Sequence, residues 1–293
     1  MNLVNLNFLS TQTTPAITMK IVFSPRCLEY STPGHPESPE RVRSAYEHLA
    51  ESYTIIEPKP VDDQTVLEVH TERMVDTVKS GNFYDPDSPA YPGIYEYAKL
   101  SVGAACLAAK EKGFALTRPP GHHAGKNFFH GFCYLNNIAI AVQKLGKTTL
   151  IIDIDGHHGD GTQDIFRGNP KVVYVSLHRE HIFPGTGYSS VDNCLNYPLP
   201  AGVGDKGYLE TLEKALIQAE KLGKNYELVA ISAGFDTYGY SDLASLGLTT
   251  QCYKKIGEMI AGLGLPVFVS LEGGYKVKEL GPNIDHLLQG LEG

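Results

Sequence analysis

Short apolar runs alternate with longer amphipathic segments along the chain from Met19 onward. The runs are rich in β-branched residues and are mostly apolar on both faces, which is typical of strands covered by helices on both sides. They are Lys20 to Phe23, Phe114 to Leu116, Thr148 to Ile154, Val172 to Leu177, Leu228 to Ser232 and Val267 to Leu271. The pattern predicts an α/β fold with a central parallel β-sheet flanked by helices on both faces.

Helices are predicted where apolar residues recur at helical spacing between these runs. They are Thr65 to Ser80, Ile94 to Lys112, Leu135 to Leu145, Tyr208 to Leu222 and Thr249 to Leu263. Glycine readily adopts the left-handed conformation that closes a helix, so glycines just after these segments are expected stop signals. The expected stops are Gly113, Gly146, Gly223 and Gly264.

A chain of 293 residues, 42% of them hydrophobic, can bury one large core, so we expect one domain over residues 19–293. Residues 1–18 contain no Lys or Arg and lack the features of a secretory signal, so we expect a flexible N-terminal extension. No apolar stretch approaches the roughly 18 to 20 residues that span a bilayer. A cytoplasmic location without a membrane partner is therefore expected.

Charge and cysteine usage narrow the function classes. The net charge of −8 and the lack of a long basic run argue against direct binding to nucleic acid. The cysteines are scattered and include no CxxC pair, so we expect reduced thiols rather than disulfides or a thiolate metal site. They are Cys27, Cys106, Cys133, Cys194 and Cys252.

Polar residues are dense directly after four of the predicted strands. The segments are Arg118 to His123, Asp153 to Gly161, Ala233 to Asp236 and Glu272 to Tyr275. Because ligands of an open parallel sheet bind beyond the carboxyl ends of its strands, these segments are expected to form one site.

Asp153, Asp155 and His157 alternate along the second of these segments, so an extended chain presents them on one side. Asp155 and His157, joined by Asp236 from another strand, would provide three ligands and leave an open position, as catalytic zinc requires. A single Asp or His at a strand end more often caps a turn. Several buried carboxylates without a cation would, however, cost several kcal/mol per ion, so the pattern predicts a metal site.

Motifs spread over the chain resemble the histone deacetylase and acetylpolyamine amidohydrolase family, which has the arginase-deacetylase fold. The matching segments are Arg118 to Ala124, Gly131 to Asn137, Asp153 to Gly161, Phe183 to Gly187 and Leu271 to Tyr275. The amino-acid sequences of these segments are most similar to those of the class II branch and its bacterial relatives. The resemblance implies a zinc-dependent enzyme that hydrolyses the amide of an acetylated or short-acylated amine, such as acetyl-lysine.

Position by position, the resemblance implies a role for each site residue. The implied zinc ligands are Asp155, His157 and Asp236. The implied catalytic residues are His123 with its partner Asp160, His122 with its partner Asp153, and Tyr275 as the oxyanion donor. A potassium ion is implied at Asp153, Asp155, His157, Ser176 and the Leu177 backbone.

The resemblance also implies a narrow substrate channel. Phe132 and Phe183 match its two aromatic walls, with Gly131 beside Phe132, and Gly273 lets the loop of Tyr275 approach closely. Asp87 matches a rim carboxylate that holds a substrate amide, although neighbouring Asp85 leaves the register open. The segment from Pro33 to Arg41 resembles the start of the first helix of the family and is expected to be structural.

The sequence departs from the family pattern at two places, and three alternative functions remain open. Gly156 replaces a larger apolar residue, and the segment after Asp236 lacks the acidic gate of polyamine-selective relatives, with Leu243 or Ala244 at that position. The alternatives are an amidohydrolase of acetylpolyamines or other small molecules, an arginase-like enzyme with two manganese ions, and a non-catalytic acyl-lysine reader. The sequence indicates neither the acyl length nor the oligomeric state.

Overall fold

The computed structural model describes residues 19–222, 224–240 and 242–293, in which one eight-stranded sheet forms the centre. All neighbouring strands run parallel. In spatial order the strands are β2 (Ile55–Ile56), β1 (Ile21–Val22), β3 (Phe114–Ala115), β8 (Val267–Leu271), β7 (Leu228–Ala233), β4 (Thr149–Asp153), β5 (Val172–Arg179) and β6 (Cys194–Leu199). The predicted α/β fold with a parallel sheet is confirmed. The predicted N-terminal extension, residues 1–18, lies outside the described residues.

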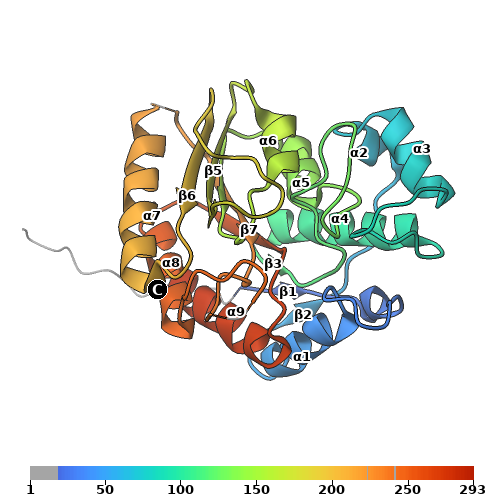
Figure 1. The fold of residues 1–293 in the computed structure, drawn as a ribbon, viewed down its shortest axis with the longest axis horizontal. Helices are drawn as coiled ribbons and strands as arrows, with labels where there is room; N and C mark the ends of the chain where they lie inside the picture. The colour runs from blue at the N-terminus through green and yellow to red at the C-terminus, as the bar shows by residue number, and fades with distance from the viewer. Residues whose placement is uncertain (1–18, 223, 241) are drawn as a thin grey trace, which may run out of the picture.

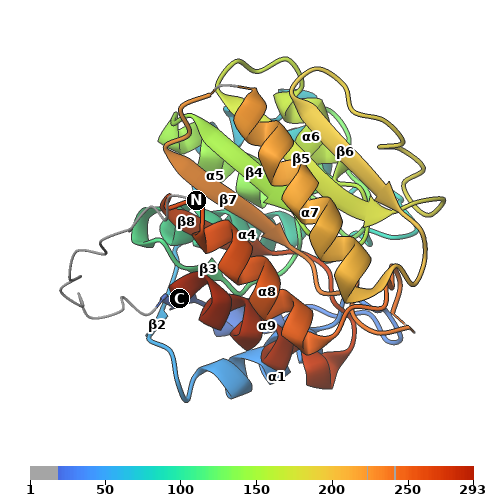
Figure 2. The same cartoon turned by 90° about the vertical axis from the view of Figure 1, so that its left-hand side faces the viewer.

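Helices cover both faces of the sheet (Figures 1 and 2). One face carries α1 (Pro39–Leu49), α7 (Gly204–Lys221), α8 (Thr250–Ala261) and α9 (Val277–Glu292). The other carries α4 (Ile94–Glu111), α5 (Asn137–Leu145) and α6 (Asp160–Phe166), with α2 (Asp63–Leu67) and α3 (Glu72–Ser80) packed outside them. A 3-10 turn, η1, spans Pro25–Leu28. None of the described helices is long and apolar enough to cross a membrane.

Alternating side chains on the strands explain why both faces need cover. On β4, Leu150 and Ile152 belong to the core beneath α7 and α8, whereas Ile151 belongs to the core beneath α4 and α5. Each strand of such a sheet is therefore apolar on both sides, which is the pattern that the sequence shows.

Some sequence expectations about elements are wrong in detail. The helix expected over Thr65 to Ser80 is two helices, because Thr71 accepts a hydrogen bond from the Met74 amide and starts α3 anew. Strands β2 and β6 were not predicted; the first has only two residues, and the second is an edge strand that contains Pro198, a residue uncommon within strands. Helix α4 ends with Lys112 in the left-handed conformation rather than with a glycine, whereas Gly146 ends α5 as expected. Gly223 lies outside the described residues.

The strand order explains where a site can form. The four strands that lead into polar segments, β3, β8, β7 and β4, are consecutive neighbours in the sheet. Their carboxyl ends therefore lie side by side at one edge, as the sequence predicts. No disulfide joins the five cysteines, all of which lie among the described residues.

Candidate active site

Three predicted ligands meet at the carboxyl ends of β4 and β7. The ligand atoms of Asp155, His157 and Asp236 all lie within 4.8 Å of one another. Nδ1 of His157 is 3.1 Å from Oδ1 of Asp155 and 2.8 Å from Oδ2 of Asp236. Both carboxylates are buried, and His157 lies at the floor of a cavity. We refer to these three residues as the acidic cluster.

The acidic cluster fits a bound cation. Oδ2 of Asp236 is buried, yet no donor of the described residues meets it in hydrogen-bond geometry. The backbone of Gly273 donates to Oδ2 of Asp155 at 2.8 Å, and a Cβ on this glycine would come within 2.5 Å of the same oxygen. Burial alone would lower the pKa of His157, but the two carboxylates raise it to about 10. A cation at this point would replace that proton, and two carboxylates with an imidazole are a suitable donor set for zinc.

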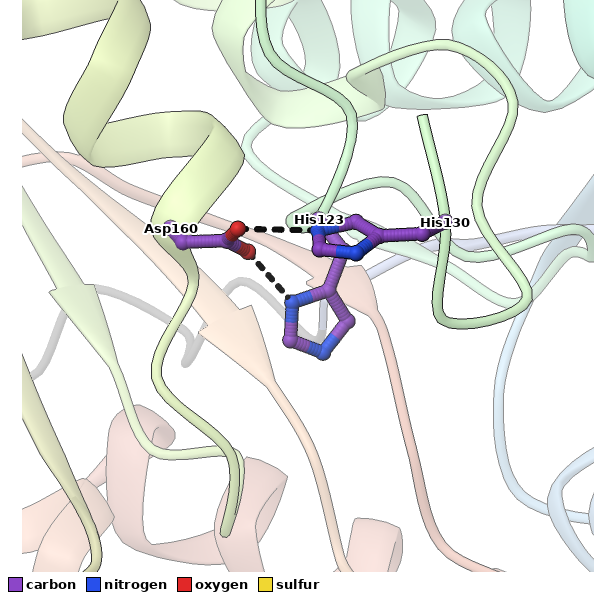
Figure 3. Close-up of side chains that lie close together, drawn as sticks. All are labelled: His123, His130 and Asp160. Carbon is purple, nitrogen blue, oxygen red and sulfur yellow. Dashed lines mark hydrogen bonds and ion pairs between the residues drawn. The ribbon is translucent and has the colours of Figure 1, made fainter. Parts of the chain in front are cut away.

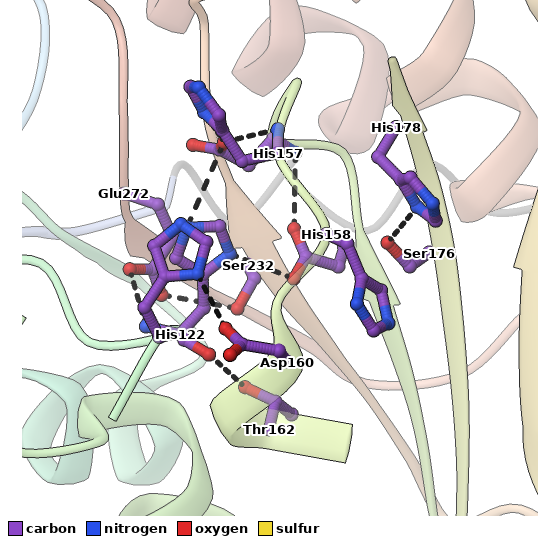
Figure 4. A network of polar contacts seen from close by, with 12 residues as sticks. His122, His157, His158, Asp160, Thr162, Ser176, His178, Ser232 and Glu272 are labelled. Carbon is purple, nitrogen blue, oxygen red and sulfur yellow. Dashed lines mark hydrogen bonds and ion pairs between the residues drawn. The ribbon is translucent and has the colours of Figure 1, made fainter. Parts of the chain in front are cut away.

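His122 is held beside the acidic cluster by buried carboxylates. Its Nδ1 is 3.1 Å from Oδ2 of Asp153, and the Tyr174 hydroxyl donates to the same oxygen at 2.8 Å. Glu272 accepts the His122 amide at 3.1 Å (Figure 4). Burial raises the pKa of Glu272 to about 7, although His122 acts against this rise. The pairing of His122 with Asp153 agrees with the sequence prediction.

His123 pairs with a different carboxylate. Its Nδ1 is 2.8 Å from Oδ1 of Asp160, at the start of α6 (Figure 3). Burial, and then the charge of His122, lower the pKa of His123 to about 3, so its imidazole is neutral at pH 7. Because Nδ1 faces Asp160, the other ring nitrogen, Nε2, is left to accept a proton. The second oxygen of Asp160 lies 2.8 Å from Nε2 of His130, a residue that the sequence analysis missed.

The cavity above these residues has a volume of about 610 Å³. Gly131, Phe132 and Phe183 line it, and the Phe183 ring packs edge-on against His123 at 5.0 Å. A Cβ on Gly131 would come within 2.6 Å of His123, so a glycine is required for this close approach. These three residues therefore line the same cavity, and their role as channel walls remains a prediction.

At two places the sequence left open which of two residues faces the cavity: Asp85 or Asp87, and Leu243 or Ala244. Asp87 lines the cavity, whereas Oδ1 of Asp85 accepts the amides of Asp87 and Ser88 at 3.0 and 2.7 Å. Leu243 lines the cavity, and Ala244 is buried where a Cβ on Gly156 would meet it at 2.3 Å. Gly156 therefore makes room for the segment that carries Leu243.

The loop that carries Tyr275 is anchored by residues far away in sequence. Arg41 donates to the Gly274 carbonyl at 2.6 Å and to the Glu272 carbonyl at 2.7 Å, and its guanidinium lies 4.8 Å from the Tyr275 ring centroid. Asp242 accepts the Tyr275 amide at 3.1 Å. From the sequence, only a structural role is expected for the segment around Arg41. The sequence holds no local signal for these contacts, because they join distant segments.

Ser176 and Leu177 lie on β5 beside Asp153 of β4, in direct register for Ser176. Both are buried. The Ser176 hydroxyl is 2.8 Å from Nδ1 of His178. The predicted potassium residues are thus neighbours, and the ion itself remains a prediction.

A parallel α/β sheet with paired histidines and carboxylates at its carboxyl edge fits a hydrolase. Residues 35–291 match the histone deacetylase domain, and the chain belongs to this family. It is 36% identical to a probable deacetylase of Archaeoglobus fulgidus over 88% of this chain and 81% of that protein.

Three further comparisons carry more specific names. The chain is 37% identical to the acetylpolyamine amidohydrolase of Mycoplana ramosa over 69% of this chain and 64% of that protein. The crystal structure of acetylpolyamine aminohydrolase from Burkholderia pseudomallei superimposes with a TM-score of 0.83 at 26% identity, covering 93% of this chain and 98% of that one. The crystal structure of the HDA15 HD domain superimposes with a TM-score of 0.86 at 32% identity, covering 94% and 89%.

Proposed function

We propose that this enzyme is a zinc-dependent deacetylase that hydrolyses the amide of an acetylated or short-acylated amine, such as acetyl-lysine. The observation that carries the proposal is the acidic cluster of two buried carboxylates and one imidazole, whose His157 lines a cavity in a histone deacetylase domain. Zinc at Asp155, His157 and Asp236 would polarise the acyl carbonyl and lower the pKa of water to near neutrality.

His123 is the proposed general base and acid. It is neutral at pH 7, and its Nε2 is available because Asp160 holds Nδ1. In this role, it takes a proton from the attacking water and returns it to the leaving amine. His122, held by Asp153, is the proposed electrostatic neighbour that favours the developing negative charge.

Tyr275 is the proposed oxyanion donor. Its side chain lines the cavity, its ring packs edge-on against Phe132 at 5.8 Å, and Arg41 and Asp242 hold its loop. A hydroxyl positioned in this way stabilises charge that develops only in the transition state, which is why it accelerates the reaction.

The substrate would enter between Phe132 and Phe183, beside Gly131, with Asp87 at the rim as an acceptor for an amide or ammonium group. Gly273, whose amide donates to Asp155, would let the loop of Tyr275 lie close to the acidic cluster. We also propose potassium at Asp153, Asp155, His157, Ser176 and the Leu177 backbone, as a structural ion. Cytoplasmic location remains a prediction from the sequence.

The acetylpolyamine alternative follows from the names of two relatives. The acidic residue after Asp236 that could act as a polyamine gate is Asp242, but its carboxylate binds the Tyr275 amide. Leu243, which lines the cavity, is apolar. On the side of the cavity formed by Leu243, this arrangement favours an acyl-lysine chain over a second ammonium group.

The test is hydrolysis of a panel of acyl amines that differ in acyl length and amine carrier, with metal content measured by elemental analysis. We expect one zinc per chain and turnover of acetyl-lysine. Tyr275→Phe should lower kcat by about 100-fold, because one oxyanion donor contributes about 3 kcal/mol. Equal activity of the wild type and Tyr275→Phe would contradict the oxyanion role, and two manganese ions per chain would favour the arginase-like alternative.

A further inference from the structure

Asp160 contacts two histidines, one with each of its carboxylate oxygens. Its Oδ1 is 2.8 Å from Nδ1 of His123, and its Oδ2 is 2.8 Å from Nε2 of His130 (Figure 3). The His123 side chain is 4% exposed and that of His130 is 28% exposed, so the three groups run from the cavity floor toward solvent. Burial acts to raise the pKa of Asp160, but the bonds from both histidines hold it below its usual range.

The His130 ring is held by its surroundings. Phe183 and Phe128 pack edge-on against it, with ring centroids 5.0 and 5.4 Å away. The backbone then reverses, because Gly131 and Phe132 both have positive φ, at 57° and 70°. For Phe132 this conformation costs on the order of 1 kcal/mol, which the fold has to offset. The reversal lets His130 contact Asp160 while Phe132 lines the cavity.

A carboxylate with a single partner can rotate, and its two oxygens then compete for that partner. In this site His130 occupies Oδ2, which leaves Oδ1 directed at Nδ1 of His123. A fixed acceptor at Nδ1 keeps the proton of the neutral imidazole there, so Nε2 remains the basic nitrogen. Asp160 is ionised and accepts both hydrogen bonds, so both histidines donate to it.

We propose that His130 is a positioning residue for the general base: it binds the second oxygen of Asp160 and thereby fixes the tautomer and orientation of His123. The inference rests on the proposed function for its kinetic consequences only. The geometry itself concerns three side chains of this chain and does not depend on the substrate.

The same three residues also offer ligand atoms within 4.8 Å of one another, as a metal site would. Each oxygen of Asp160, however, already lies at hydrogen-bond distance from one ring nitrogen. Two hydrogen bonds therefore account for the cluster without an ion.

The kinetic test compares His130→Leu with His130→Gln. Leucine removes the donor, and glutamine replaces it with an amide N–H that does not titrate. We expect His130→Leu to lower kcat by about 10- to 100-fold with KM unchanged, as when the outer partner of a positioned histidine is lost. His130→Gln should recover most of the rate. Equal losses in both variants, or none in either, would overturn the proposal.

His48→Leu is the matched control. His48 is also a half-exposed histidine beside a carboxylate, with its Nε2 3.5 Å from Oδ2 of Asp285, but this pair joins α1 to α9 and lies outside the cavity lining. Its kcat should equal that of the wild type. Thermal unfolding of all variants checks that the losses are not caused by unfolding.

A double-mutant cycle with Asp160→Asn tests the route of the effect. If His130 acts through Asp160, His130→Leu should cause no further loss of kcat in the Asp160→Asn background. Additive losses would mean that His130 acts by another route, for example through the wall residue Phe183, and would overturn the proposal.

A measurement without substrate separates this inference from the proposed function. Side-chain ¹⁵N NMR of the histidines should show His123 protonated at Nδ1 alone in the wild type and in His130→Gln, and a mixture of tautomers in His130→Leu. An unchanged tautomer in His130→Leu would overturn the positioning role even in an active enzyme. Zinc titration completes the test: a second zinc that disappears in His130→Leu would replace the positioning role with a metal site.

Discussion

Two buried clusters of charge lie close together in this molecule and resolve the same physical problem differently. One is the acidic cluster of Asp155, His157 and Asp236; the other, the ion cluster, consists of Glu37, Arg41 and Arg118. All but His157 are buried nearly completely. Removing charges from water is costly, so each cluster needs compensation.

The ion cluster is compensated by the chain itself. Arg118 donates to both carboxylate oxygens of Glu37, at 2.7 Å each, and to the carbonyls of Cys27 and Tyr30. Arg41 donates to Oε1 of Glu37 at 3.1 Å. The acidic cluster has two carboxylates and one imidazole, so the chain supplies one negative charge more than the protonated imidazole can offset. The comparison indicates that the chain itself compensates the first cluster, whereas the second has the donor set for which we propose zinc.

Asp236→Asn should have the largest effect, and it should appear in catalysis. The variant keeps the oxygen that accepts the Gly156 amide but removes one negative charge from the acidic cluster. We expect activity to fall at least about 1000-fold, because metal-supported charge stabilisation contributes several kcal/mol. In the metal-free protein the free energy of unfolding should stay within about 1 kcal/mol of the wild type or rise, because the two carboxylates exceed the single charge of the protonated His157 and the variant removes this excess.

Asp192→Asn is the control for this change, since Asp192 forms an exposed ion pair with Arg167. Activity should be unaffected. A large loss of metal-free stability in Asp236→Asn, measured by urea unfolding in chelator, would mean that the acidic cluster is structural after all.

Arg118→Met, in contrast to Asp236→Asn, should mainly lower the free energy of unfolding. It leaves Glu37 buried with one partner fewer, and breaking a buried ion pair costs about 3–4 kcal/mol. We expect the free energy of unfolding to fall by this amount. Arg167→Met removes an arginine with a carboxylate at a similar distance, 2.8 Å, but at the surface. That control should cost less than about 1 kcal/mol, and equal costs for the two variants would be incompatible with the comparison.

The pH dependence of the ion cluster should give the smallest effect. Burial would raise the pKa of Glu37, but Arg118 and Arg41 outweigh burial and hold it below its usual range. A carboxyl whose folded pKa is lowered contributes stability above its unfolded pKa, near 4.3, and loses it as the pH falls through the folded value. The stability difference between the wild type and Glu37→Gln should therefore be constant from about pH 8 to 5 and narrow below about pH 4.

Urea unfolding of the two proteins over this pH range makes the measurement. The narrowing should amount to about 1.4 kcal/mol for each unit by which the folded pKa is lowered. A difference that changed between pH 6 and 8 instead would point to a histidine rather than to Glu37.

The sequence by itself determined much of the fold and the place of the site. Apolar runs on both faces predicted a covered parallel sheet, and the four polar segments predicted one edge for the site. These inferences succeed because alternation and strand direction are local properties of a chain. Helix ends were less certain: Thr71 divides a segment that has one continuous amphipathic pattern.

Only the tertiary structure decided which partners the buried charges have. Glu37 and Arg118 are 81 positions apart, and Arg41 lies 233 positions from the Gly274 carbonyl that it binds. The sequence predicted one partner for Asp160, His123, but its second carboxylate oxygen contacts His130. Such contacts depend on which loops pack over the carboxyl ends of the strands. A side chain carries no local mark of a partner that the fold brings from elsewhere, so the compensation of buried charge becomes visible only when the chain is folded.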